Sequence, residues 1–357
     1  MKLGVITLGG PGARMIIEKA RKYFDEVEEI NIKKLTTRVS TNGTEVFYED
    51  KLLKGFDCLY MRGSWRYEQL LYTVSYLLQG KVYLPLYHSV FPTCHNKLLT
   101  LLRLQKDGVA VPETYFCSNA EEARNVLERV NYPIILKTPA GTQGKGVMFA
   151  DSISSAKSLL DALEAFNQPY LIQEYIDTGA TDIRAFVVGD KVIAAMKRKA
   201  ASNELRANIH AGGTGMAFEL DYDTEQLAIK AAKSIKAEIC GVDILQGSKA
   251  VVLEVNSSPG LAGVMEASGV PVDDLVAKYL YENTKKWVEG RRKEGVDDIM
   301  KGLEPKKVLA KNILTNVEIK SGRIKLPEVV TRLAGFNNGD EVVIDIDRQS
   351  VAIRKNM

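Results

Sequence analysis

The stretch VDILQGSKAVVLEVN, residues 242–256, decides the fold that we expect for this chain. Two apolar runs flank a short polar segment that contains a glycine, which is the pattern of a β-hairpin. With Gly247 and Ser248 at the tip of the turn, counting outward along both strands places Asp243 opposite Val252. A slip of one residue would turn Asp243 to the other face, so this register is a prediction that coordinates can test.

Three oxygen-bearing side chains share one face of this hairpin. Side chains alternate along a strand, so Val252, Glu254 and Asn256 point the same way, and Asp243 joins them. Two carboxylates and one amide oxygen are hard ligands, which suit Mg²⁺ held between a protein and phosphate groups. A solvated polar face is the alternative, but the rest of both strands is apolar, and unpaired buried carboxylates are unfavourable. Asp243, Glu254 and Asn256 are therefore predicted metal ligands.

Composition indicates an ordinary soluble globular protein. The 357 residues are 45% apolar and 26% charged, with a net charge of +3 that is too small to indicate nucleic acid by itself. Four scattered cysteines without a CxxC pair argue against structural zinc and against a disulfide framework. The opening MKLGVITLGG predicts a first strand rather than a signal peptide, and no apolar run approaches the roughly 20 residues of a membrane span. We expect a cytoplasmic protein with no membrane partner.

The pattern of apolar residues predicts α/β and α+β regions in sequence. Residues 1–95 read strand–helix–strand, with LGVITL and CLYMRG as strands, which predicts an open, mostly parallel sheet. Residues 96–282 mix strands with amphipathic helices in an α+β arrangement. Residues 283–307 are highly charged and predict a helix that frays into a linker. Residues 308–357 form a separate, small, β-rich unit.

A glycine-rich stretch and several cations accompany the acidic face. KTPAGTQGKGV, residues 137–147, fits neither a Walker loop nor a dinucleotide fingerprint, and taken alone it is either a plain hairpin or a ligand loop. Lys137 and Arg184 stand in otherwise apolar strands. Cations, two carboxylates and a glycine-rich flap together favour a site for a triphosphate and magnesium.

Six motifs resemble one family of enzymes. KTPAGTQGKGV, IQEYI, TDIRAFVVGDKVIAAMKRKA, ELRANIHAGG, GVDIL and LEVNSSPGLAG, in this order and spacing, resemble the ATP-grasp ligases, and among them the RimK-like glutamate ligases. The resemblance covers about residues 1 to 280. It implies the ATP-grasp fold, with an N-terminal open βαβ domain and two α+β lobes that hold a nucleotide between them.

The resemblance also implies an activity and its cofactors. Such an enzyme is an ADP-forming carboxylate–amine ligase, which makes an amide through an acyl phosphate. It would use ATP with Mg²⁺, or with Mn²⁺, to join glutamate or another amino acid to a terminal carboxylate of a peptide, protein or cofactor. The glycine-rich stretch would then be the mobile loop that closes over the triphosphate.

Roles carry over from the family by position in this sequence. Arg184 and Arg198 would lie near the transferred phosphate, and Gly260, in the turn SSPGL, would help to hold the acceptor end of the site. The catalytic set is Arg184, Arg198, Asn256 and Gly260. The expected nucleotide contacts are Lys97, Lys137, Gly144, Lys145, Gly146, the adenine-binding backbone of Glu174, Tyr175 and Ile176, the ribose-binding Asp182, and Arg206, Ala207 and Asn208.

Two further residues are candidates for substrate contact. Arg62 follows the strand CLYMRG at the carboxyl end of the predicted parallel sheet, where it could grip a substrate carboxylate. His210 follows the Arg206 segment. His88 and His95 have no obvious partner in the sequence, and we expect them to be structural.

The tail resembles a second family. GRIKLPEVVTRLAGFNNGDEVVIDIDRQSVAIRK, residues 322–355, is similar to the AbrB-like swapped-hairpin domains, which pair by exchanging hairpins and many of which bind DNA. Acidic residues dilute its basic set, so we expect a homo-oligomer, with dimerisation or substrate presentation favoured over DNA binding. A DNA-binding regulator with the ligase body as sensor is one alternative. A ligase of the D-Ala–D-Ala type is another, which the ELRANIH segment argues against.

Overall fold

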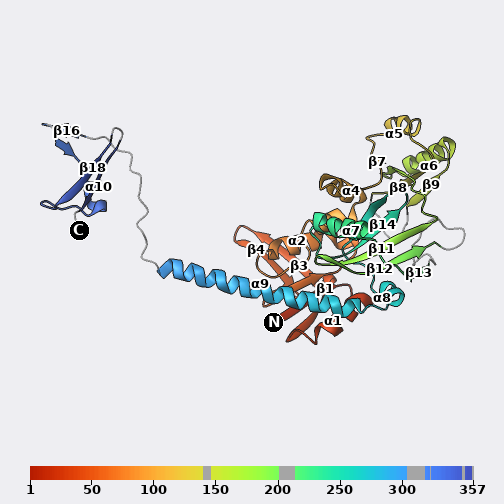
Figure 1. Ribbon diagram of the computed structural model, residues 1–357, viewed down its shortest axis with the longest axis horizontal. Helices are drawn as coiled ribbons and strands as arrows, with labels where there is room; N and C mark the ends of the chain where they lie inside the picture. Colours follow the sequence, from red (N-terminus) through yellow and green to blue (C-terminus); the bar gives the residue numbers. More distant parts are fainter. Residues whose placement is uncertain (140–145, 201–213, 304–317, 322, 348–349, 356–357) are drawn as a thin grey trace. The chain divides into compact units, whose positions relative to one another are not determined.

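The computed structural model describes residues 1–139, 146–200, 214–303, 318–321, 323–347 and 350–355 (Figure 1). The chain divides into two units, Met1–Arg292, which we call the body, and Lys293–Met357, which we call the C-terminal unit. Helix α9 (Val272–Leu303) is continuous through residue 283, where the sequence predicted a boundary before a fraying linker. No described helix combines the length and the apolar character needed to cross a membrane.

The body begins with the predicted open sheet. Its order is β2-β1-β6, and both pairings are parallel, as the strand–helix–strand pattern indicated. The central strand is buried because Leu3, Val5 and Ile6 face packed layers on both sides. The elements are β1 (Lys2–Thr7), α1 (Pro11–Ala20), β2 (Glu26–Asn31), β6 (Cys58–Met61) and α2 (Glu68–Leu78). An antiparallel meander that the sequence did not predict follows β2, namely β3 (Leu35–Ser40), β4 (Gly43–Tyr48) and β5 (Lys51–Leu52).

A four-stranded sheet forms the first lobe of the α+β region. Its order is β7-β10-β8-β9, and helices α5 and α6 complete a separate hydrophobic cluster against it. Helix α6 begins in a capping box, in which Ser152 and Ser155 exchange side-chain-to-backbone hydrogen bonds. The elements are β7 (Thr114–Tyr115), α5 (Ala120–Leu127), β8 (Ile134–Lys137), β9 (Val147–Ala150), α6 (Ile153–Ala165) and β10 (Leu171–Glu174).

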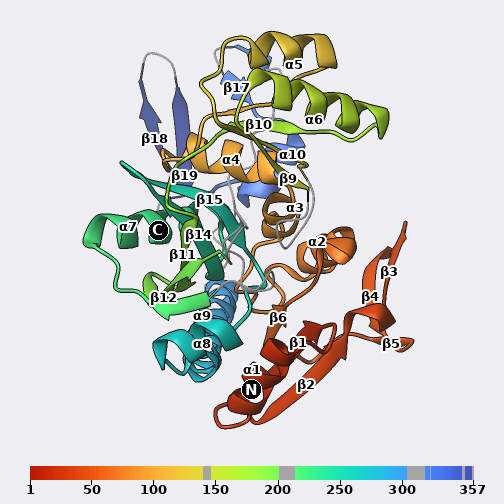
Figure 2. The same cartoon turned by 90° about the vertical axis from the view of Figure 1, so that its right-hand side faces the viewer.

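A five-stranded antiparallel sheet forms the second lobe. Its order is β13-β12-β11-β14-β15, and it lies between the first lobe and the β1 and β2 end of the body in both Figure 1 and Figure 2. Helix α7 packs against it through a small apolar stripe that includes Ala228, Ala231 and Ala232. The strands and helix are β11 (Thr181–Val188), β12 (Lys191–Lys199), β13 (Thr214–Ala217), α7 (Tyr222–Ile235), β14 (Ile239–Gln246) and β15 (Ala250–Asn256). Three short helices complete the body, α3 (Val90–His95), α4 (Lys97–Lys106) and α8 (Ala262–Ser268).

The hairpin of β14 and β15 corrects the register that the sequence predicted. Gln246 pairs with Ala250, so three residues rather than two form the turn, and a bulge follows Asp243, which lies opposite Glu254 rather than Val252. Because the bulge reverses the alternation, Val252 points into the core and is fully buried, not toward the acidic face. The longer turn shifts the pairing by one residue and the bulge shifts it by one more. Because side chains alternate with a period of two, a total shift of two leaves Asp243 on the same face as Glu254 and Asn256.

The C-terminal unit consists of two hairpins and one helix. Its elements are β16 (Glu318–Lys320), β17 (Arg323–Lys325), α10 (Glu328–Ala334), β18 (Val342–Ile346) and β19 (Val351–Lys355). Helix α10 ends at Gly335, whose φ of 70° lies in the left-handed region that favours glycine. None of the described side chains of this unit is fully buried. The short strands and helix match the predicted β-rich tail, and the AbrB-like assignment stays a prediction.

Candidate active site

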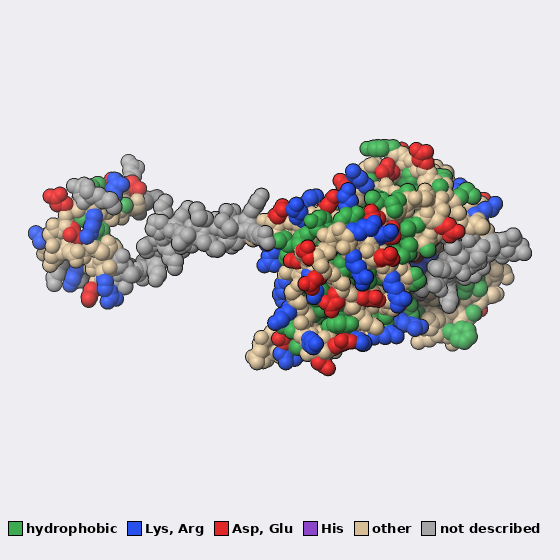
Figure 3. All heavy atoms as spheres, turned by 90° about the horizontal axis from the view of Figure 1, so that it is seen from below, with side chains coloured by type: hydrophobic (Ala, Val, Ile, Leu, Met, Phe, Trp, Pro, Cys, Tyr) green, Lys and Arg blue, Asp and Glu red, His purple; other side chains and the backbone are tan. Residues whose placement is uncertain are grey.

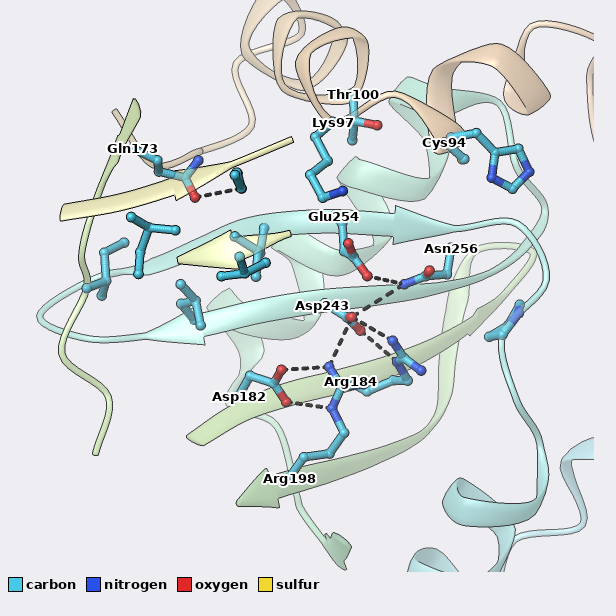
Figure 4. Close-up of a pocket in the computed structure, with 18 of the residues that line it drawn as sticks. Cys94, Lys97, Thr100, Gln173, Asp182, Arg184, Arg198, Asp243, Glu254 and Asn256 are labelled. Carbon is cyan, nitrogen blue, oxygen red and sulfur yellow. Dashed lines mark hydrogen bonds and ion pairs between the residues drawn. The ribbon is translucent and has the colours of Figure 1, made fainter. Parts of the chain in front are cut away.

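A cavity of about 530 Å³ brings most of the predicted site residues together (Figure 4). Its walls come from the loop after β6, from α3 and α4, and from both α+β lobes. Of the predicted residues, the cavity is lined by Lys97, Lys137, Glu174, Tyr175, Ile176, Asp182, Arg184, Arg198, Asp243, Glu254, Asn256 and Gly260.

Four charged side chains form a continuous network across β12, β11 and β14. Arg184 donates two hydrogen bonds to Asp243, at 2.7 and 2.6 Å, and Arg198 donates two to Asp182, at 2.5 and 2.7 Å. Arg198 also lies 3.0 Å from Asp243. The partners are directly opposite in the ladder, so the antiparallel register itself places acid beside base.

The acidic end of the network fits a divalent cation. The Asn256 amide nitrogen donates to Glu254 at 3.1 Å and lies 3.4 Å from Asp243, so the three predicted ligands converge (Figure 4). An amide nitrogen between two carboxylates marks a point where positive charge is favoured. Burial followed by the negative charge of Asp243 raises the pKa of Glu254, which a cation would relieve.

The donor set also narrows the choice of metal. The described residues contain no cluster of three or more His, Cys, Asp or Glu side chains suited to a metal. The predicted site instead combines two carboxylates, of Asp243 and Glu254, with the amide of Asn256. Hard oxygen ligands of this number suit Mg²⁺ that shares its coordination with phosphate oxygens and water. Burial opposes ionisation of Asp243, but the guanidiniums of Arg184 and Arg198 outweigh it and lower the pKa of this carboxyl. Asp243 is thus held ionised as a ligand must be.

Two lysines extend the positive side of the cavity. Lys137 is buried at the end of β8, and its ammonium donates to Gln173 at 2.7 Å. Burial lowers the pKa of Lys137 to about 8, with Glu254 opposing this effect and Lys97 adding to it. Burial likewise lowers the pKa of Lys97, which begins α4 and points toward Glu254 (Figure 4). Two desolvated ammonium groups bind an anion more strongly than two hydrated ones would.

The predicted hinge follows β10 along the cavity wall. The backbone N–H of Glu174 donates to the Glu113 carbonyl at 3.0 Å, so adenine binding would fall to the backbone of Tyr175 and Ile176. Tyr175 meets the ring of Phe149 edge to face, at 5.2 Å between centroids. Asp182, the predicted ribose ligand, has both carboxylate oxygens engaged by Arg198, and its ribose role stays a prediction.

Arg62 does not reach the cavity wall, contrary to the expectation that it grips substrate. Its guanidinium is 7% exposed and donates to the Pro259 carbonyl at 2.6 Å and to the Tyr60 hydroxyl at 3.1 Å. The next residue, Gly63, donates its backbone N–H to Ser258 at 3.1 Å. These hydrogen bonds join the end of β6 to the turn that precedes Gly260, so Arg62 stabilises the position of that turn and does not itself line the cavity.

Several predicted residues lie outside the described part of the chain. They are Gly144, Lys145, Arg206, Ala207, Asn208 and His210. Gly146 is described, and its φ of 77° together with an added Cβ only 2.6 Å from the Thr138 hydroxyl explains why glycine stands there.

The cavity also contains polar groups that the sequence did not single out. His95 was expected to be structural, yet it lines the cavity, and neither its buried Nε2 nor the Ser257 hydroxyl finds a hydrogen-bond partner in the described structure. Gln173 links Lys137 to Thr114 through hydrogen bonds of 2.7 and 2.6 Å. The buried Nδ1 of His88 likewise finds no hydrogen-bond partner in the described structure, but His88 does not line the cavity and packs among the rings of α2 and the loop before α3. Isolated His, Ser and Gln residues give no signal of their own in a sequence.

Comparison with known proteins identifies the fold and family. Residues 94–280 match the family described as RimK-like ATP-grasp domain. A protein of Cellvibrio japonicus named "Probable alpha-L-glutamate ligase" is 34% identical over 277 residues, which cover 76% of this chain and 92% of the relative. A protein of the same name from Stutzerimonas stutzeri is 36% identical over 276 residues, covering 76% and 91%. The chain belongs to the RimK-like ATP-grasp family.

Solved structures support the fold of this ATP-grasp ligase. The ligase PsnB, complexed with a phosphomimetic variant of its minimal precursor, Mg and ADP, superposes with a TM-score of 0.62 at 19% identity, covering 79% of this chain and 98% of PsnB. A RimK domain ATP-grasp protein from Sphaerobacter thermophilus gives 0.60 at 18% identity, covering 78% and 99%. The two lobes around the cavity are the ATP-grasp fold, and the chain is an ATP-dependent, amide-forming ligase.

Proposed function

We propose that this ligase joins an amino acid, glutamate as in the names of its relatives, to the carboxylate of an acceptor, with ATP and Mg²⁺ bound in the 530 Å³ cavity. The observation that carries the proposal is the convergence of Asp243, Glu254 and Asn256 beside two arginines, the buried Lys137 and the half-buried Lys97. Anionic phosphates and one divalent ion match this distribution of charge. Mn²⁺ as a substitute and a cytoplasmic location stay predictions.

In the first step the acceptor carboxylate attacks the γ-phosphate, forming an acyl phosphate and releasing ADP. Lys137 and Lys97 would hold phosphate oxygens, and Asp243, Glu254 and Asn256 would hold Mg²⁺, which supplies charge neutralisation during phosphoryl transfer. Arg184 is 16% exposed and faces the cavity from β11, so its guanidinium can turn from Asp243 to the transferred phosphate. Arg198 is more deeply buried and keeps Asp182 and Asp243 in place.

In the second step the amine nitrogen attacks the acyl carbon, and phosphate leaves as the C–N bond forms. The amine gives up a proton, and a tetrahedral oxyanion develops on the former carboxylate oxygen. A preorganised donor at such an oxyanion is worth roughly 3 kcal/mol, and Arg184 is placed to supply it. Ser257 and His95 offer further polar groups in the cavity wall for binding the acceptor or the amine.

The test is ADP release and product mass in a matrix of amino acids and carboxylate acceptors. We expect ADP and a product that is heavier by one amino-acid residue in at least one pair, and neither with Asp243→Asn. Since Asp243 pairs with two arginines, circular dichroism of the variant must first show that it is folded. Turnover by a folded Asp243→Asn protein at the wild-type rate would contradict the assignment of the metal site.

We also propose that the C-terminal unit pairs with a second copy of itself. One face of the β18–β19 hairpin presents Ile344, Ile346, Val351 and Ile353, of which the first three are 52%, 75% and 52% exposed. In the β16–β17 hairpin, the side chains of Ile319 and Ile324 are 70% and 53% exposed. Such faces are unfavourable in water and favour pairing, as in the swapped-hairpin domains that the tail resembles.

The alternatives are less well supported. The relatives are named glutamate ligases, which favours this activity over that of a D-Ala–D-Ala ligase. On the face of the body seen in Figure 3, Lys and Arg side chains are interspersed with Asp and Glu. The DNA-binding alternative places the contact in the tail, where Asp340, Glu341 and Asp345 dilute the cations. DNA binding there would fall steeply with salt.

A further inference from the structure

A second cavity, of about 250 Å³, lies at the carboxyl ends of the parallel strands of the body. Leu8 follows β1, Lys33 follows β2, and Ser64, Arg66 and Tyr67 follow β6, and these five residues line it. The sheet order β2-β1-β6 means that the chain leaves β1 toward one side and later returns on the other. Open parallel sheets bind ligands at such a point, outside the carboxyl ends of the strands.

The charges of this second cavity favour an anion. Its described lining includes two cations, Lys33 and Arg66, and no acid. No ion pair of either cation occurs among the described residues, whereas the neighbouring Lys34 and Arg38 pair with Glu49 and Glu45. Two cations that face the same cavity without a counter-ion repel each other, and a bound anion would offset that repulsion.

The second cavity adjoins the active-site cavity. Ser64 lines both, and Trp65, which is 41% exposed, lines the larger one. The Arg66 guanidinium lies over the Trp65 ring, 5.6 Å from its centroid, which is a cation–π contact. Trp65, which lines the larger cavity, thus holds Arg66 next to the active site. A ligand that enters the larger cavity and extends past Ser64 therefore meets Lys33 and Arg66.

We propose that Lys33 and Arg66 bind a second anionic group of the acceptor, distant from the carboxylate that is ligated. The acceptor class is then an acidic chain, such as a peptide with carboxylates besides its terminal one. This inference rests on the proposed function and adds a substrate class to it. Tyr67 and Leu8 would contact the aliphatic part of that chain, because both present apolar surface to the same cavity.

Isothermal titration of the full-length protein with two acetylated peptides tests this site without turnover. The probes are Glu-Glu-Glu-Glu and Gln-Gln-Gln-Glu, which share the terminal residue and differ in internal charge. We expect the wild-type protein to bind the acidic peptide about tenfold more tightly at low salt, since two exposed ion pairs contribute roughly this much. In the Lys33→Gln/Arg66→Gln variant the ratio is expected to fall to about one.

A matched variant separates this site from overall charge. Lys34→Gln/Arg38→Gln removes the same charge from the same domain but from residues outside the cavity, and it should keep the tenfold ratio. Equal binding of both peptides by the wild type, or an unchanged ratio in Lys33→Gln/Arg66→Gln, would overturn the proposal. So would an equal loss in both variants. Failure of the proposed function shows differently, as an absence of ADP and ligated product with either peptide.

Discussion

The body and the C-terminal unit differ in how far they bury their apolar side chains. In the body Leu3, Ile16 and Phe186 are 0% exposed within one large core, whereas in the C-terminal unit Ile319 and Ile346 are 70% and 75% exposed. The body can therefore fold as a single chain and carry its chemistry in an internal cavity. None of the described side chains of the C-terminal unit is buried, which is why we propose that it pairs with a second copy of itself. Variants that damage one region and spare the other test this division.

The largest effect is expected from Glu254→Gln, which removes one carboxylate from the predicted metal site. The amide cannot replace the charge that holds Mg²⁺, so kcat/KM should fall about a thousandfold or more, or at least about 4 kcal/mol. The side chain keeps its shape, and because burial and the charge of Asp243 raise the pKa of Glu254, its negative charge opposes folding, so its removal should not destabilise the body. Steady-state ADP release measures the loss, and sedimentation should show unchanged self-association.

A matched change outside the cavity is the control for this variant. Glu18→Gln in α1 alters an exposed glutamate of the same unit and should leave kcat/KM as in the wild type. A Glu254→Gln protein that remains within threefold of wild-type activity would show that the two carboxylates do not hold a catalytic ion.

The next effect concerns the stability of the body. Arg198→Met leaves Asp182 and Asp243 without a shared partner in a buried network, so the free energy of unfolding should fall by about 3 kcal/mol. Arg124→Met is the control, because Arg124 also contacts two carboxylates, of Asp161 and Glu164, but at the exposed surface, where much less is lost. Urea unfolding of both variants measures the difference. Equal losses would mean that burial does not set the strength of the Arg198 network.

A smaller effect is expected in the C-terminal unit. Ile344→Asp places a charge on the apolar face of the β18–β19 hairpin, which should weaken self-association by about thirtyfold, or about 2 kcal/mol. Ile344→Val keeps the face apolar and should associate as the wild type does. Analytical ultracentrifugation over a range of concentrations measures both. A wild-type chain that stays monomeric at every concentration would refute the pairing, and the melting of the body should not change in either variant.

The sequence predicted the acidic face of the β14–β15 hairpin for a reason that is only partly correct. Alternation of side chains assigned Asp243, Glu254 and Asn256 to one face, and they do converge there. The turn has one residue more than predicted and the bulge adds another, and these errors cancel because alternation has a period of two. The prediction for Val252 is wrong, because this residue lies between the turn and the bulge, where the shift is only one residue, and its side chain faces the core.

Other parts of the site could not be predicted because they depend on tertiary contacts. Arg62 has the sequence position of a ligand-binding residue, but only the packing of the Pro259 turn against β6 reveals that its donors are already engaged. His95 and Ser257 reach the cavity through the placement of α3 and of the turn after β15, which no local pattern encodes. The motifs of the body, by contrast, are local and contiguous, which is why the parallel sheet, the lobes and the family were predicted.

The smallest effect is a pH dependence that belongs to the body alone. Burial lowers the pKa of Lys137 from 10.5 to about 8, so the free protein loses this charge as the pH rises above about 8. Bound phosphates favour the charged form, so the Kd for ATP should rise by up to tenfold per pH unit there, or about 1.4 kcal/mol, with a proton taken up on binding. The unfolded chain keeps its proton up to about pH 10.5, so the same shift makes folding relatively more favourable as the pH rises from 8 to 10.5.

Titration calorimetry of ATP binding in two buffers of different ionisation enthalpy measures the number of protons taken up on binding. Lys137→Arg keeps its charge throughout this range and should remove the weakening near pH 8; an unchanged profile would assign the effect to another group.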